Sequence, residues 1–150
     1  MSAWRIVTDE DVLSALNSAE LAAYRRILAE EDGSDGDVLP DIIDTAVMEA
    51  RGRIAACGRN TLATGLTVPE VVIHHLVAIV RYRLLTRLGI RAKEERAQEY
   101  KDARRFFEEI ARCMVAIPSP DGVDDTAQSN PVPTVKSRPP RFSRHQQDGI

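Results

Sequence analysis

The sequence contains few aromatic side chains and only two cysteines. Aromatic residues make up 5% of its 150 residues. Ala, Leu, Ile, Val, Glu and Arg dominate, a composition that favours helices. Cys57 and Cys113 lie in apolar, helix-like stretches and belong to no CxxC or Cys/His ligand spacing. They predict reduced thiols in a helical core and exclude the cysteine-rich framework of a small secreted domain.

A secretion signal and a membrane-length apolar run are also missing. The first residues, MSAWRIVTDED, are acidic and include no apolar core, so we expect no signal peptide. The longest apolar run, VVIHHLVAIV, covers about half of a membrane span. These features predict a soluble protein that is made in the cytoplasm and does not contact membranes.

The common motifs of catalysis and cofactor binding are absent. The sequence contains no GxxxxGK[ST], GxGxxG, GxSxG or HExxH. His74 and His75 are adjacent, so on a helix they point about 100° apart and cannot chelate one metal ion. The carboxylates of residues 9–11 and 30–37 lie in expected caps and loops, where solvated charge is usual. We therefore expect no enzyme, no catalytic residue, no cofactor and no metal site.

Five helical segments account for most of the first 116 residues. Thr8 is the predicted N-cap of a short first helix, and a second helix starts after Ser18 and ends at the acidic loop EEDGSDGD. The third helix is expected from Pro40 to Cys57 because its apolar residues recur at intervals of four and three. Gly52 inside it marks either a close backbone approach or a tolerated glycine.

The fourth and fifth expected helices form the centre of the fold. Thr67 and Glu70 fit a capping box, and the following run is apolar nearly all round, as in a helix that is covered on several sides. The fifth helix, about residues 92–116, has one apolar seam that is expected to pack along the fourth. The residues predicted to be buried are Ile73, Leu76, Val77, Val80, Leu84, Phe107, Ile110 and Met114.

The helical pattern stops near residue 117, and six of the eight prolines follow. The predicted fold class is all-α, a small bundle of about five helices (1–116) with a long extended proline-rich C-terminal arm (117–150). Pro139 and Pro140 exclude a helix near the end of the chain, where arginines flank Phe142. This ending is either disorder with a stray aromatic, or an arm whose partner is another molecule.

Charge is distributed unevenly along the chain. Residues 1–50 carry twelve acidic residues and three arginines, a net charge of −9, whereas residues 51–116 carry a net charge of +6. The split reflects either solvated helix faces or two complementary surfaces that join copies head to tail. In the second reading, the predicted subunit interface comprises Glu30, Glu31, Asp35, Asp37, Arg81, Arg83 and Arg87.

The order of these features resembles the head-completion or head–tail adaptor (connector) proteins of tailed bacteriophages, in their Mu-like branch. The matching pieces are WRIVTDEDVLSAL, IIDTAVMEARGRIAA, VPEVVIHHLVAIVRYRLL, KEERAQEYKDARRFFEEIA and the closing RFSRHQQDGI. The resemblance implies a structural virion protein of the neck, forming a dodecameric ring whose C-terminal arms dock on the portal. The portal-binding residues that it suggests are Pro139, Pro140, Arg141, Phe142, Ser143, Arg144 and Ile150.

The same resemblance implies which partners the protein has. They are the portal protein, neighbouring copies, a tail-side neck or tail terminator protein and, non-specifically, DNA in the ring's lumen. Two alternatives stay open. One is a DNA-binding regulator or small DNA-packaging subunit, since Arg81, Arg83, Arg87 and Arg91 could contact phosphates. The other is an enzyme or accessory factor whose site has no recognisable motif.

Overall fold

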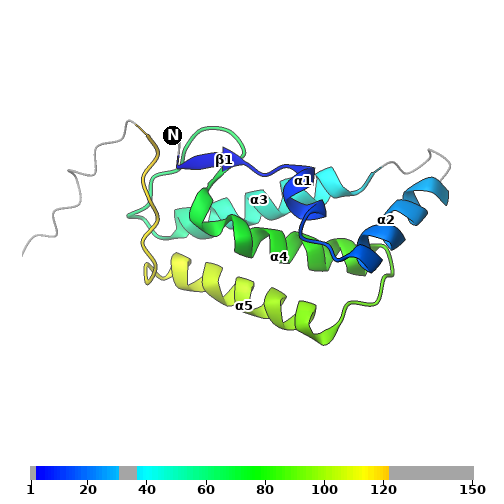
Figure 1. The fold of residues 1–150 in the computed structure, drawn as a ribbon. Coiled ribbons are helices and arrows are strands. Elements are labelled where there is room, and N and C mark those ends of the chain that lie inside the picture. Colours follow the sequence, from blue (N-terminus) through cyan, green and yellow to red (C-terminus); the bar gives the residue numbers. More distant parts are fainter. Residues whose placement is uncertain (1–2, 31–36, 122–150) are drawn as a thin grey trace, which may run out of the picture.

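Three long helices form the bundle at the centre of the protein. The computed structural model describes residues 3–30 and 37–121. The bundle helices are α3 (Leu39–Ala56), α4 (Glu70–Arg87) and α5 (Glu94–Ala111). All three pack on one another, and α4 runs in the opposite direction to the other two (Figure 1).

Shorter elements flank this bundle. They are strand β1 (Trp4–Ile6), helix α1 (Asp9–Leu13), helix α2 (Ser18–Glu30) and strand β2 (Thr67–Pro69). In Figure 1, α2 extends beyond the bundle at the end where α4 finishes. The predicted helical fold class is confirmed, with two short strands as an addition, while residues 122–150 of the predicted arm lie outside the described residues.

Helix α4 is the core of the molecule, as its apolar sequence predicts. Leu76, Val80 and Leu84 are completely buried. The other predicted core residues that are buried are Ile73, Val77, Phe107 and Ile110. On α3, the seam with intervals of four and three is also buried, from Ile43 to Ile54. A Cβ atom added at Gly52 would meet nothing within 4 Å, so this glycine marks no close approach.

The predicted capping box at the start of α4 is wrong. Thr67 belongs to β2 and pairs with Ile6 of β1, and its hydroxyl donates to the carbonyl of Thr64 at 3.0 Å. Pro69 is the N-cap instead, and the Glu70 amide donates to the carbonyl of Ala3 at 2.8 Å. The pairing with β1, distant in sequence, therefore overrides the local capping pattern.

Two other helix starts have reciprocal caps. Thr8 caps α1 as predicted, with Asp11 as the residue that bonds back to the Thr8 amide. At α2, the Asn17 side chain accepts from the Glu20 amide at 2.8 Å, and the Glu20 carboxylate accepts from the Asn17 amide at 2.9 Å. Each box satisfies two backbone amides at the start of its helix.

Helix α5 ends earlier than its apolar seam predicts. The last helical residue is Ala111, and Cys113 has a φ of 60°. The amides of Cys113 and Met114 donate to the carbonyls of Ile110 and Glu109, which is the Schellman pattern that closes a helix. Because the chain turns away there, Met114 is 69% exposed, and its predicted burial is wrong.

Candidate functional site

The predicted portal-binding residues lie outside the part of the chain that the structure describes. They are Pro139, Pro140, Arg141, Phe142, Ser143, Arg144 and Ile150. Glu31 and Asp35 of the predicted subunit interface fall in the other undescribed stretch, residues 31–36. These assignments stay predictions.

The two described acidic residues of the predicted interface differ in their surroundings. Glu30 ends α2 with a side chain that is 70% exposed and 4.0 Å from Arg26. Asp37 accepts hydrogen bonds from the Tyr24 hydroxyl at 2.8 Å and from the Leu39 amide at 3.0 Å. Burial, followed by this bond to Asp37, raises the pKa of Tyr24. Asp37 thus already anchors the start of α3, whereas Glu30 faces solvent.

Arg81 is held inside its own chain. Its side chain is 11% exposed, pairs with Glu99 and donates to the carbonyl of Ala15 at 2.8 Å. Arg96 bridges Glu99 at 3.2 Å and Glu20 at 3.1 Å. Burial alone would raise the pKa of Glu20, but its bonds from Arg96 and the Asn17 amide bring it below the ordinary value. This network fastens α2 and the turn after α1 to the bundle, and it uses Arg81, which was predicted to lie at a subunit interface.

Arg83 and Arg87 lie on the same side of α4, beside α3. Arg83 donates to both carboxylate oxygens of Glu49, at 3.1 and 2.6 Å, and this pairing raises the pKa of Arg83. Arg87 is exposed. The two arginines line an open hollow of about 300 Å³ with Val38, Asp41, Ile42 and Thr45. Of the three predicted basic residues, Arg87 is therefore the most accessible to another molecule.

A second hollow, of about 290 Å³, lies between α3, α4 and α5. Arg83 lines this one too, so the two hollows adjoin along α3. Ala50, Ile79 and Phe107 contribute apolar surface, and Arg53 and Arg104 contribute charge. A face with this mixture of apolar and charged groups suits a protein partner.

His74 and His75 have different surroundings, as expected for adjacent residues on one helix. His74 is exposed, while His75 is half-buried and stacks on Phe106 with 3.9 Å between ring centroids. Burial, followed by the neighbouring His74, lowers the pKa of His75. Within residues 3–30 and 37–121, no group of three or more His, Cys, Asp or Glu side chains could hold a metal ion. No helix in these same ranges is long and apolar enough to cross a membrane.

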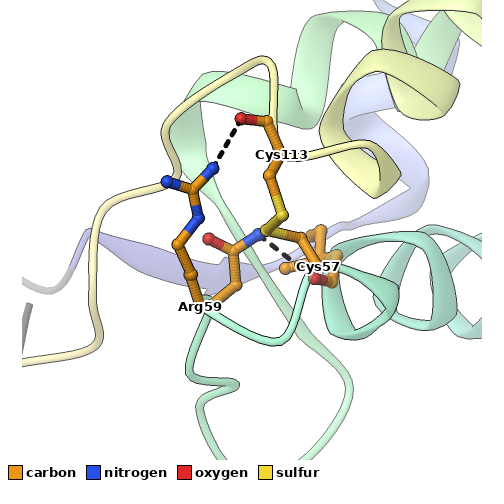
Figure 2. The surroundings of a disulfide bond; sticks show 5 residues. Cys57, Arg59 and Cys113 are labelled. Atoms are coloured by element: carbon orange, nitrogen blue, oxygen red, sulfur yellow. Dashed lines mark hydrogen bonds between the residues drawn. A yellow bond between two sulfur atoms is a disulfide. The ribbon is translucent and has the colours of Figure 1, made fainter. Parts of the chain in front are cut away.

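The prediction of two reduced thiols is wrong, because Cys57 and Cys113 form a disulfide bond (Figure 2). Helices α3 and α5 run in the same direction, so their final turns meet at one end of the bundle. Cys57 directly follows α3, and Cys113 comes two residues after α5. The two cysteines are 56 positions apart in the sequence, so local spacing does not reveal their proximity.

Residues 112–121, which we call the strap, continue from α5 across this end of the bundle (Figure 1). The Arg59 guanidinium donates to the carbonyl of Cys113 at 2.9 Å (Figure 2). The indole of Trp4 donates to the carbonyl of Pro118 at 2.9 Å. The structure therefore places residues on both sides of the predicted domain boundary at residue 116 against the bundle.

Sequence reasoning also missed the role of Arg5. Its guanidinium donates to both carboxylate oxygens of Asp11, at 2.8 and 3.0 Å, and to Glu70 at 2.5 Å. It thereby joins β1, α1 and the start of α4. The acid-rich stretch TDED indicated an N-terminal helix turn, but no local pattern showed which arginine would face it.

Comparison with known proteins identifies a family to which the sequence is similar. No curated protein and no solved structure matches the chain. The family model described as Bacteriophage Mu, Gp36 matches residues 7–135, which include every helix of the bundle and the strap. Because this match covers most of its length, the chain belongs to the bacteriophage Mu Gp36 family.

Proposed function

We propose that this protein is a structural component of a Mu-like phage virion and acts in the neck, between head and tail. In this role it forms a ring on the portal and presents a surface to a tail-side neck or tail terminator protein. Membership of a Mu phage family is the observation that carries the proposal. The resemblance of the sequence to head–tail adaptors supplies the specific position.

The geometry supports this role in two ways. The hollows along α3 combine apolar groups with charged ones, as protein interfaces do. The 29 residues that follow Asp121 provide enough chain to reach a neighbouring molecule, since an extended chain spans about 3.3 Å per residue. Their closing Arg-Phe-Ser-Arg sequence could place Phe142 in an apolar pocket, with arginines pairing to acidic groups around it.

The alternative of a DNA-binding regulator or packaging subunit has less support. Binding of phosphates depends on positive charge that carboxylates of the same chain do not already neutralise. Arg81 and Arg83, two of the four that suggested this function, are paired with Glu99 and Glu49. Non-specific contact with DNA inside a ring lumen stays compatible with the proposed role.

Truncation of the C-terminal arm tests the proposal. We expect a chain that lacks residues 131–150 to keep its helicity and melting temperature, because the described bundle ends before this segment. The truncated chain should fail to attach to portal-bearing heads, which can be measured by co-sedimentation and by the yield of tailed particles.

Point variants sharpen this test. Phe142→Ala should weaken attachment by more than about 1 kcal/mol if the phenyl ring of Phe142 fills a pocket of the portal. Phe142→Leu keeps an apolar side chain and should weaken attachment less. If the truncated protein completes heads as efficiently as the full chain, the arm is not the portal-binding element.

A further inference from the structure

The disulfide bond lies where the bundle ends and the strap begins. Cys57 is the C-cap residue of α3, and Cys113 is the first residue past the cap of α5. A covalent link at this point fixes the strap to the neighbouring helix at its root. Its presence or absence therefore decides how firmly the residues after α5 are held.

The backbone conformation at Cys113 favours glycine, so the presence of cysteine at this position is explained by its sulfur atom and not by the turn. Gly89 closes α4 with φ 67° and the same pair of amide bonds, from Gly89 to Thr86 and from Ile90 to Leu85. Glycine favours this left-handed position, which side chains with a Cβ atom adopt at a cost. Cys113 occupies it with φ 60°, so the turn itself would be better served by glycine.

Besides the disulfide, side chains of the strap pack against the bundle. Side chains alternate between half-buried and exposed from Cys113 to Ile117, as in an extended segment with one face on the bundle. Val115 and Ile117 face inward and pack against the core. With the bonds from Arg59 and Trp4, these contacts hold the strap against the bundle, and the disulfide adds a covalent tie where the strap begins.

The disulfide is also within reach of a small reactant. A hollow of about 210 Å³ beside the bond is lined by both cysteines, Arg59, Asn60 and Met114, among others. Cys57 is 3% exposed, whereas Cys113 is partly exposed. The Arg59 guanidinium adds positive charge to this hollow, which favours an approaching thiolate.

We propose that Cys57 and Cys113 form a thiol–disulfide exchange site that fastens and releases the strap, with small thiols or dithiols as co-reactants. In the opening direction, a thiolate attacks the sulfur of Cys113. The bond between the two protein sulfurs breaks, and Cys57 leaves as a thiolate that takes up a proton. A second thiolate then attacks the sulfur of the first thiol in this mixed disulfide, and Cys113 leaves as a thiolate that takes up a proton. Two small thiols are thereby oxidised to one disulfide, and the protein gains two thiol groups.

This site couples the strap to the redox state of its surroundings. In a reducing compartment the open form is expected, and in an oxidising one the closed form. The 29 residues after Asp121 start from the strap, so the same reaction fixes or frees their point of departure. The inference concerns the chain alone and does not depend on a role in the phage neck.

Redox titration of the purified full-length protein tests the proposal. The protein is equilibrated at a series of ratios of reduced to oxidised glutathione, and its free thiols are counted by alkylation and mass spectrometry. We expect conversion between a form with two free thiols and a form with none. Hydrogen exchange of strap amides should be at least about tenfold faster in the reduced form, because exchange reports local opening. The reduced form should also melt roughly 10 °C lower.

Two matched variants separate the bond from other effects. Cys57→Ser removes the bond and should show the fast strap exchange of the reduced protein at every glutathione ratio. Met114→Ala changes an exposed residue of the same hollow and should titrate like the wild type. The proposal is overturned if no disulfide forms at any ratio. It is also overturned if strap exchange differs by less than about twofold between the oxidised and reduced wild-type protein.

Discussion

At the scale of single residues, several arginines act as internal ties between distant segments. Arg5 joins β1 to Asp11 and Glu70. Arg51 donates to the carbonyls of Ala63 and Thr67 at 2.8 and 2.6 Å, which holds the segment between α3 and β2. A charge count along the sequence therefore overstates how much positive charge is free to meet a partner.

The pairing of Asp11 with Arg5 predicts a specific loss of stability in acid. Hydrogen bonds from the Arg5 guanidinium lower the pKa of Asp11 to about 2, from an ordinary value of 3.8. The folded state therefore binds this proton less readily than the unfolded chain, and the stabilisation is complete above about pH 4 and lost as pH falls toward 2. In urea unfolding at a series of pH values, Asp11→Asn should be less stable than wild type at pH 7 and should lose less stability between pH 5 and 2.

Glu10→Gln provides the control for that experiment. Glu10 lies in the same first turn of α1 and is exposed, so its removal changes the same type of charge. Its stability should fall with acid as steeply as that of the wild type. Equal slopes for wild type and Asp11→Asn would show that the Arg5 pair does not contribute to stability.

At the scale of the elements, sequence patterns predicted helix interiors better than helix ends. The seam from Ile43 to Ile54 and the buried run around Leu76 follow from periodicity, because burial of one helix face is a local property of the sequence. The start of α4 was mispredicted because Thr67 is recruited into a strand by Ile6. An end of a helix depends on what the flanking chain meets, and that partner can be distant in sequence.

In the candidate site too, the sequence predicted which residues share a helix but not which residues meet between helices. The sequence indicated Arg83 and Arg87 as a basic group on one helix, and the structure places both on one hollow beside α3. It could not show that Glu49 already pairs with Arg83, since this contact depends on how two helices pack. The Cys57–Cys113 bond was unpredictable for the same reason, because it requires α3 and α5 to end side by side.

In the two Schellman turns, at Gly89 and Cys113, glycine should be more stable than alanine. Gly89→Ala should destabilise the protein by about 1 kcal/mol, because φ is 67° and the added Cβ atom meets no neighbour within 4 Å. In a Cys57→Ser background, where no disulfide forms, Cys113→Gly should be more stable than Cys113→Ala by a similar amount. Chemical denaturation of the wild type and of these three variants measures the differences. Equal stabilities of the last two would mean that the turn at Cys113 does not persist without the bond.

At the scale of the whole molecule, only part of the charge split in the sequence is available for association. Arg81 is half-buried and paired with Glu99, and Asp37 anchors Tyr24 and the start of α3. Glu30 and Arg87 are exposed. If copies join through opposite charges, this pair is a better candidate for the contact than the residues that already have partners in their own chain.

Charge reversal tests whether these exposed groups join neighbouring copies. Arg87→Glu and Glu30→Lys should each impair assembly on portal-bearing heads, and the double variant should partly restore it, because the reversed charges attract again. Each pair at an exposed rim typically contributes about 0.2–1 kcal/mol, but a ring repeats the contact at every interface. Arg105→Glu serves as the matched control, since Arg105 is 79% exposed on α5 and its reversal changes net charge equally. Sedimentation across a salt series measures the effect, which should shrink as salt screens the pairs. If both single reversals assemble like the wild type at every salt concentration, the uneven charge serves only to solvate the helix faces.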